Sequence, residues 1–311
     1  MNLYKLHKRM AMAAVATLFL TANSCCPHPT GAARLRTSAF PTCTSKAINT
    51  VLITGQNNHN WPVSHPILKQ ILEDSGLFKV DLAVSPAEGE DFSGFNVDFS
   101  KYDLVVLDYN GDPWNKKMKQ EFLSFVQDGG GVVIYHAADN AFADWDEFNR
   151  IIALGGWGGR DENSGPYTHF KDGTLVQEQV SGPAGSHGDQ HEYTMTCRCP
   201  EHPIVKGLPL QWTHGKDELY DRMRGPGNIK DLLYTAYSPV EKRGSGYEEP
   251  LVFTVDYGKA RILHLMIGHV QDSYENSPAL QCVGFKTLLL RGSEWAATGK
   301  VTQKVPNNFP I

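Results

Sequence analysis

Apolar and polar positions divide the first half of the chain into strands and helices that alternate. The pattern predicts unbroken apolar strands at 48–55, 102–111 and 132–135, an alternating edge strand at 78–84, and amphipathic helices around 67–72 and at 116–128. An apolar run without alternation is typical of a strand that is covered on both faces, as in a parallel sheet between helices. Strands that alternate with helices indicate right-handed crossovers and a doubly wound sheet.

The second half of the chain is less regular. Residues 160–190 are polar and rich in glycine, and we expect loops and a hairpin there that cover the site. The remaining pattern predicts a short strand at 192–195, closing strands at 229–238, 249–257 and 260–267, and a last helix at 278–295. The sequence therefore predicts an α/β fold with a mostly parallel sheet, helices on both faces, and one domain with long loop insertions.

The start of the chain has the order of a secretory signal. A basic stretch is followed by apolar residues 10–20 and by small residues that end at Cys25 and Cys26. The apolar stretch is too short for a spanning helix, so we predict a signal peptide at 1–26 and export to the periplasm or cell envelope. Two alternatives stay open, a lipid anchor on Cys25 and plain cleavage.

Composition sets the remaining boundaries and excludes one class of partner. We predict a flexible linker at 27–46, a domain at 47–298 and a C-terminal tail at 299–311. The net charge is −5 and no basic cluster follows the leader, so nucleic acid is excluded as a partner. No motif for a nucleotide cofactor is evident.

Six cysteines in a chain of this length do not make a disulfide scaffold. Cys197 and Cys199 are too close in sequence for the usual zinc spacing, and the sequence leaves open whether either pairs with Cys43 or Cys282. No G-x-S-x-G motif occurs, and His136 stands where a nucleophilic cysteine would follow its strand. A cysteine-dependent amidotransferase is therefore disfavoured.

Several predicted strands end in a polar side chain. His59, Asp108 with Asn110, His136 with Asp139, and His269 each follow an apolar run. The carboxyl ends of parallel strands share one edge of a sheet, so these residues can meet in one cleft, where Glu218 can join them. The alternative for His136 is a core histidine that is held by a backbone carbonyl.

Three imidazoles and a carboxylate suit a divalent metal ion, with zinc first, because neutral histidine and ionised carboxylate are its usual ligands. The same groups suit general acid–base chemistry on a sugar hydroxyl or on a carbon beside a ketone. No HExxH or H-x-x-x-H pair is present to decide between the two.

Tryptophans lie in or beside the predicted site loops, at positions 61, 114, 145, 157 and 212. Sugar rings stack on aromatic faces, so this placement favours a carbohydrate ligand, although aromatic residues are also ordinary core material. His187, His191 and His202 lie in loop-rich sequence and are interpreted as solvated or capping residues, and His264 as structural.

With these residues in hand, the chain resembles the trehalose-utilisation ThuA-like family. The resemblance covers about residues 47–295 and rests on the segments Thr54-Gly55 with His59 and Trp61, 129–138, His202-Pro203-Ile204, Asp217-Glu218-Leu219-Tyr220, and 258–261 leading to Gly268-His269. It implies the flavodoxin-like sheet of the class I glutamine amidotransferase-like superfamily, with histidine in place of the cysteine nucleophile. It also implies trehalose-type disaccharides or 3-keto-glycosides as substrates, sugar oxidoreductases as pathway partners, and in some members a metal ion.

Together these observations predict an exported protein of carbohydrate metabolism that performs acid–base or metal-assisted chemistry on a sugar, as a hydrolase, lyase or isomerase of oxidised sugars. The catalytic residues and metal ligands are predicted to be His136, His269 and Glu218. The substrate-binding residues are predicted to be His59, Trp61, Asp108, Asn110, Asp139, Trp157 and His214. The alternative is a non-catalytic carbohydrate-binding or accessory protein to a sugar oxidoreductase.

Overall fold

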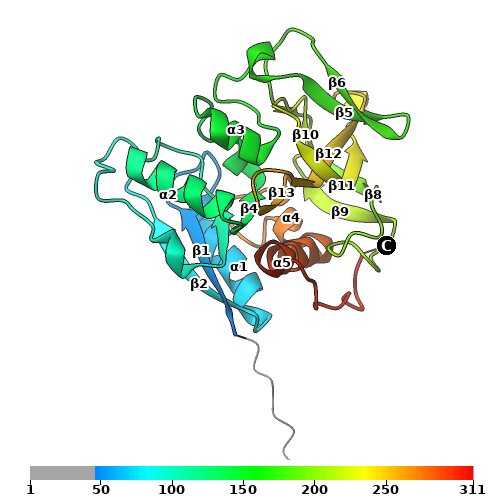
Figure 1. The fold of residues 1–311 in the computed structure, drawn as a ribbon. Helices are drawn as coiled ribbons and strands as arrows, with labels where there is room; N and C mark the ends of the chain where they lie inside the picture. The colour runs from blue at the N-terminus through cyan, green and yellow to red at the C-terminus, as the bar shows by residue number, and fades with distance from the viewer. Residues whose placement is uncertain (1–45, 311) are drawn as a thin grey trace, which may run out of the picture. The chain divides into compact units, whose positions relative to one another are not determined.

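Parallel strands form one half of the central sheet in the computed structural model, which describes residues 46–310 (Figure 1). In spatial order they are β2 (Phe78–Val84), β1 (Ile48–Thr54), β3 (Leu104–Leu107), β4 (Gly131–Tyr135) and β13 (Arg261–Leu265). All neighbouring pairs in this half are parallel. The order β2-β1-β3-β4-β13 is that of a flavodoxin-like sheet, as the sequence predicted.

Antiparallel strands extend the same sheet beyond β13. They are β12 (Glu248–Val255), β11 (Ile229–Tyr237), β8 (His191–Cys197) and β9 (Gln211–Asp217). A hairpin of β5 (Tyr167–Lys171) and β6 (Thr174–Glu178) pairs with β12, and β7 (Ser186–His187) pairs separately with β10 (Tyr220–Asp221). The sheet is therefore mixed, and its parallel half combines the first four strands of the chain with the last one, β13.

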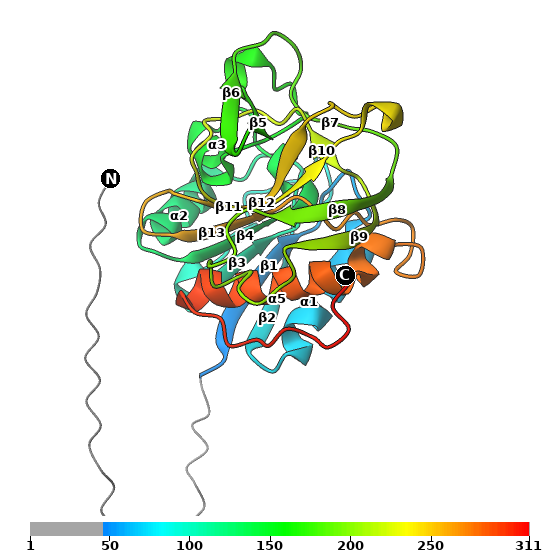
Figure 2. The same cartoon turned by 90° about the vertical axis from the view of Figure 1, so that its right-hand side faces the viewer.

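Helices cover both faces of the sheet. They are α1 (Trp61–Asp74), α2 (Lys116–Gln127), α3 (Asp146–Ile152), α4 (Pro278–Gln281) and α5 (Val283–Thr298). Figure 2 shows α1 and α5 on one face and α2 and α3 on the other. Single 3-10 turns lie at η1 (Phe99–Lys101), η2 (His136–Asn140), η3 (Glu162–Ser164) and η4 (Val240–Lys242).

Local sequence explains how these helices seat on the sheet. Asn115 caps α2 by accepting the backbone N–H of Met118 at 2.9 Å, and Met118, Phe122 and Val126 form the buried face of that helix. On the opposite face, β4 approaches α5 so closely that a Cβ at Gly131 would lie 2.6 Å from the backbone of Ala296. Glycine at this position therefore lets helix and strand pack without a side chain between them.

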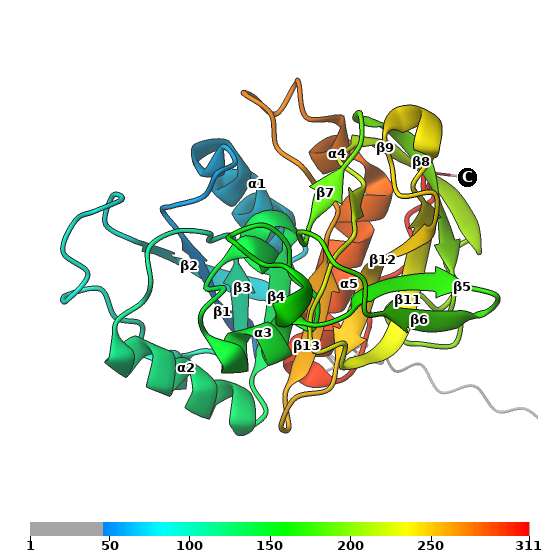
Figure 3. The ribbon, with the colours of Figure 1, turned by 90° about the horizontal axis from the view of Figure 1, so that it is seen from above.

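Two predictions need correction. The predicted last helix at 278–295 is two helices, because Cys282 leaves the helical conformation with ψ 124°. Helical spacing could not reveal this break, since apolar residues continue on both sides of it. Of the loops and hairpin that were predicted to cover the site at 160–190, the hairpin β5–β6 lies at the far side of the molecule from α2 and contributes no residue to the candidate site pocket, whereas His187 of the same stretch lines it (Figure 3).

Within residues 46–310, no helix is long and apolar enough to cross a membrane. The predicted signal peptide at 1–26 lies outside the described residues, as does the linker up to residue 45. Among the cysteines that the structure describes, Cys197, Cys199 and Cys282 form no disulfide with one another. Cys43 lies outside this part, so its predicted pairing stays a prediction.

Candidate metal centre

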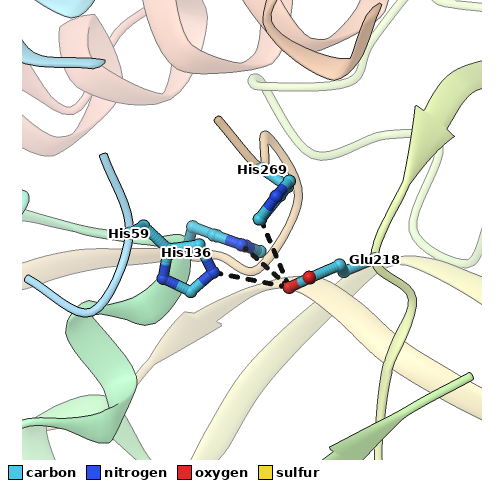
Figure 4. A group of neighbouring side chains, drawn as sticks. All are labelled: His59, His136, Glu218 and His269. Carbon is cyan, nitrogen blue, oxygen red and sulfur yellow. Dashed lines mark hydrogen bonds and ion pairs between the residues drawn. The ribbon is translucent and has the colours of Figure 1, made fainter. Parts of the chain in front are cut away.

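Four side chains from distant parts of the chain meet at the carboxyl edge of the parallel strands. His59 follows β1, His136 follows β4, His269 follows β13, and Glu218 follows β9 of the antiparallel half. One ligand atom from each lies within 4.8 Å of the other three. Figure 4 shows the three imidazole rings directed at one Glu218 oxygen. We call these residues the His3Glu cluster.

The distances within the cluster match those of a metal site. Glu218 Oε2 lies 3.4 Å from His59 Nε2, 3.7 Å from His136 Nε2 and 3.3 Å from His269 Nδ1. Ligands at about 2.0–2.2 Å from a tetrahedral zinc ion stand roughly 3.3–3.6 Å apart. The three distances from Glu218 Oε2 are therefore close to those that one small cation requires, and all four ligand atoms lie within 4.8 Å of one another.

His136 is positioned by an unusual backbone and by a carbonyl. It has φ 44°, in the left-handed region that few residues other than glycine adopt, directly after β4. Its Nδ1 lies 2.7 Å from the carbonyl oxygen of Met266. A carbonyl only accepts, so Nδ1 carries a proton, and in the neutral ring Nε2 presents its lone pair to the cluster. His136 is therefore held by a backbone carbonyl, as a core histidine would be, and is also part of the site.

His59 is oriented in the same way by amide groups. Its Nδ1 lies 3.3 Å from Asn57 Oδ1 and 3.2 Å from Asn58 Oδ1. Amide oxygens accept, so this nitrogen is the protonated one and Nε2 faces Glu218 with its lone pair. Burial lowers the pKa of His59 to about 4, so the ring is neutral at physiological pH.

Glu218 is ionised although it is buried. Burial acts to raise its pKa, but the imidazoles of His136, His269 and His59 around it outweigh burial and lower that pKa well below the usual range. A carboxylate that faces the lone pair of a neutral imidazole is unfavourable unless a positive charge lies between them. His269 Nδ1 adds a buried nitrogen without a hydrogen-bond partner. The donor set therefore fits a divalent cation.

Asp217 holds the backbone at two members of the cluster, Glu218 and His269. Its carboxylate accepts the backbone N–H groups of Gly268 at 2.7 Å, His269 at 3.0 Å and Glu218 at 2.8 Å, and it lies 2.7 Å from His214 Nε2. A Cβ at Gly268 would lie 2.4 Å from the Phe285 ring, so only glycine fits this turn. The loop that carries His269 is thus tied to the strand that carries Glu218.

A pocket of about 360 Å³ opens onto the cluster. Besides His59, Glu218 and His269, it is lined by Asn58, Asn60, Asn140, Trp157, His187, Tyr220, Val270, Gln271 and Asp272. Its size lies at the small end of the range for small-molecule sites, about 300–1,000 Å³. Amide groups and one tryptophan beside a candidate metal site suit a ligand with several hydroxyl groups.

The structure brings together the predicted catalytic and metal residues His136, His269 and Glu218. It adds His59, which the sequence predicts to bind substrate, as a fourth member of the same cluster. Trp157 lines the pocket as predicted. Trp61 and Asn110 line a neighbouring hollow of about 680 Å³ instead.

Asp108, Asp139 and His214 were predicted to bind substrate, but their side chains are buried outside the pocket lining. Asp108 accepts from Asn57 Nδ2 at 3.1 Å and so supports the loop that carries His59. Asp139 bonds to His264 at 3.2 Å, and His214 bonds to Asp217. These residues support the site from behind. Asp108 and Asp139 follow apolar runs and His214 lies within β9, and the sequence does not show which face each side chain takes.

Three of the predicted sugar-stacking tryptophans are core residues. Trp114, Trp145 and Trp212 are buried with 3%, 7% and 1% exposure, so they cannot stack on a ligand. Sequence reasoning in turn missed Tyr220, Asp217 and His187 as site residues. The signal for the first two was their place beside Glu218 in the segment 217–220, while nothing in the sequence distinguished His187 from other loop histidines.

The chain is similar to known proteins over most of the residues that the structure describes. The sequence model of the ThuA family, described as trehalose utilisation, matches residues 50–296. A crystal structure of a ThuA-like protein from Parabacteroides merdae shares 68% identity and a TM-score of 0.85, over 86% of this chain and 95% of that one. A ThuA-like protein from Bacteroides uniformis has 16% identity and a TM-score of 0.49, over 85% of this chain and 97% of its own. No curated protein matches the chain.

Proposed function

The chain belongs to the ThuA family, which is related to trehalose utilisation, and from this premise we propose that it is a metal-dependent enzyme acting on an oxidised disaccharide. The substrate class is a 3-keto-glycoside or a related keto-sugar, and the reaction is a hydrolysis, elimination or isomerisation beside the ketone. The observation that carries the proposal is the His3Glu cluster at the floor of a small polar pocket.

His59, His136, His269 and Glu218 would hold the cation, with zinc favoured by the nitrogen-rich ligand set. A cation at this position would polarise a substrate carbonyl or acidify a bound water. The residues of the chain supply orientation: His187 donates from Nδ1 to the carbonyl oxygen of Gly188 at 2.9 Å, which leaves Nε2 as an acceptor for a sugar hydroxyl. Asn140 and Gln271 add amide groups on the same pocket wall.

Turnover assays with and without metal test this proposal. Purified protein, loaded with zinc or stripped by a chelator, is incubated with trehalose and with 3-keto-trehalose, and the products are followed by NMR. We expect conversion of the keto-sugar by the loaded protein alone, with activity restored when zinc is returned. Absence of conversion by folded, loaded protein, or equal conversion by stripped protein, would contradict the proposal.

A second function is favoured by one observation. Four protein ligands around one zinc ion are typical of closed, structural sites, whereas catalytic sites keep a position for water or substrate. In this alternative the chain is a non-catalytic carbohydrate-binding or accessory protein that works beside a sugar oxidoreductase. Calorimetry distinguishes the two, because sugar binding without turnover, unchanged in His136→Ala, supports the accessory role.

Export is part of the proposal. The basic, apolar and small-residue order of residues 1–26 supports secretion, with Cys25 as a candidate lipid carrier. Mass spectrometry of the mature N-terminus from the producing cells tests it. A chain that begins at Cys25 with an added lipid mass indicates anchoring, a shortened chain without that mass indicates plain cleavage, and an intact Met1 would contradict export.

A further inference from the structure

The hydroxyl of Tyr220 lies at the inner edge of the His3Glu cluster. It lies 3.2 Å from His136 Nε2, and the Tyr220 ring stacks on the His136 ring with centroids 4.5 Å apart. Trp157 packs against Tyr220 with ring centroids 4.7 Å apart. Tyr220 is 1% exposed, so the hydroxyl has little freedom to leave this position.

The direction of this hydrogen bond follows from the tautomer of His136. Nδ1 donates to the carbonyl oxygen of Met266, so Nε2 has a lone pair and accepts from the Tyr220 hydroxyl. The same lone pair is the one that His136 would give to a cation. The cation and the Tyr220 hydroxyl cannot share this lone pair. When a cation binds, the hydroxyl keeps its proton but loses His136 as its hydrogen-bond acceptor.

A buried hydroxyl that loses its acceptor must find another, because an unpaired buried donor costs about 1–3 kcal/mol. No other hydrogen bond of this hydroxyl is present among residues 46–310. Tyr220 lines the pocket beside His59, Glu218 and His269. The space that the hydroxyl faces is therefore the space where a ligand oxygen would stand next to the cation.

The hydroxyl also keeps its proton. In its contact with His136 the hydroxyl is the donor, because the only proton between the two groups is its own. A tyrosine in this state is a hydrogen-bond donor. A donor aimed at an oxygen beside a cation stabilises negative charge on that oxygen, as in an oxyanion hole.

We propose that Tyr220 is the hydrogen-bond donor to the oxygen atom that is bound at the His3Glu cluster. This rests on the proposed metal site and narrows the ligand class to molecules that place a carbonyl or carboxylate oxygen at the cation. For a keto-sugar, the developing negative charge on the carbonyl oxygen would receive this hydrogen bond. A ligand that binds through an uncharged nitrogen gains nothing from it.

The test compares two probes of the full-length protein loaded with cobalt(II), whose visible spectrum reports ligand binding. Acetate presents an acceptor oxygen to Tyr220, and imidazole presents none. In Tyr220→Phe, we expect unchanged cobalt stoichiometry, a roughly tenfold or greater loss of acetate affinity, typical of a lost bond to a charged group, and imidazole affinity within twofold. Tyr234→Phe is the matched control, since its buried hydroxyl bonds to the carbonyl oxygen of Pro209 at 3.3 Å, away from the cluster.

If Tyr220→Phe lost affinity for acetate and imidazole equally, or lost no acetate affinity, the role of Tyr220 would be overturned while the metal site stayed in place. Failure of the native protein to take up cobalt would overturn the metal site and this role with it. A crystal structure of the native loaded protein with acetate gives a check without a variant. We expect the Tyr220 hydroxyl about 2.5–3.0 Å from an acetate oxygen, and a hydroxyl still bonded to His136 would contradict the inference.

Discussion

The carboxylate of Asp217 accepts the backbone N–H of His269 at 3.0 Å, across 52 residues of sequence. It also accepts the N–H of Glu218, so one buried carboxylate sets the spacing between two members of the His3Glu cluster. Burial acts to raise the pKa of Asp217, but bonds to His214 and to backbone N–H groups outweigh it and keep the group ionised. Asp217 is therefore a positioning residue for the metal centre.

Asp217→Asn should weaken metal binding. The amide keeps the size of the side chain but offers one oxygen in place of two to the N–H groups of Gly268, His269 and Glu218. We expect zinc affinity to fall about 10–100-fold, the range for groups that orient metal ligands. Competition with a chromophoric chelator measures it. Asp231→Asn, which changes a half-buried acid on β11, is the control, and equal affinities of the two variants would refute the role of Asp217.

Variants of His59 and His187 should differ in zinc affinity, because we propose His59 as a metal ligand and His187 only as a residue that lines the pocket. His59 Nε2 lies 3.4 Å from Glu218 Oε2 inside the cluster, whereas His187 Nε2 lies 3.7 Å from the other oxygen, at 36% exposure. His59→Ala should lower zinc affinity by more than the ~100-fold upper limit for outer-shell groups. His187→Ala should leave it within a few-fold. Isothermal titration checks both, and a reversed order of the two variants would exclude His59 as a ligand.

The parallel half of this fold could be predicted because its strands are unbroken apolar runs. Runs such as 132–135 end at the same sheet edge, so the meeting of His136 and His269 followed from topology alone. Glu218 was harder to place because it follows an antiparallel strand, whose direction and sheet position no local pattern sets. Its contact with the histidines depends on β9 lying four strands beyond β13 and on the loop after it returning to the cluster.

For a related reason, the sequence did not show that Asp108, Asp139 and His214 lie outside the pocket lining. His214 lies within β9, and a one-residue change in register would turn its side chain to the opposite face of the sheet. The sequence gives no signal for the register of β8 and β9, which contains an irregularity between His191 and Tyr193. The sequence did not point to Tyr220 as a site residue, because its place in the site depends on contact with His136, which is 84 residues away in the chain.

Cys282 should react with electrophiles at neutral pH. Burial acts to raise its pKa, but His214 and the backbone N–H groups of Phe285 and Gly215 outweigh it and lower that pKa to about 7. The thiolate is the nucleophile, so the rate of iodoacetamide labelling should rise as pH passes through about 7. Burial raises the pKa of Cys197, so its rate should stay low there.

Peptide mass spectrometry over pH 5–9 reads both rates in one sample. Loss of the imidazole in His214→Gln should move the midpoint for Cys282 to higher pH. Labelling of Cys197 as fast as that of Cys282 at pH 7 would show that the imidazole does not stabilise the thiolate.

Glu249 should make stability fall as pH rises from about 4.5 to about 8. Burial raises the pKa of this fully buried carboxyl to about 8 from an ordinary value of 4.5. The folded state therefore holds a proton that the unfolded state releases, so stability is complete below about pH 4.5 and is lost as pH rises through about 8.

In Glu249→Gln this titration is absent, so its melting temperature should fall less between pH 6 and pH 9 than that of the native protein. Glu241→Gln changes an exposed carboxylate and should behave like the native protein. Parallel melting curves for native protein and Glu249→Gln across this range would rule out a protonated Glu249.

Anomalous diffraction at the zinc absorption edge, from crystals grown with zinc, tests the metal centre most directly. We expect one strong peak within about 2.0–2.3 Å of His59 Nε2, His136 Nε2, His269 Nδ1 and Glu218 Oε2. A map with no peak between these four atoms, or with its strongest peak bound elsewhere on the chain, would contradict it.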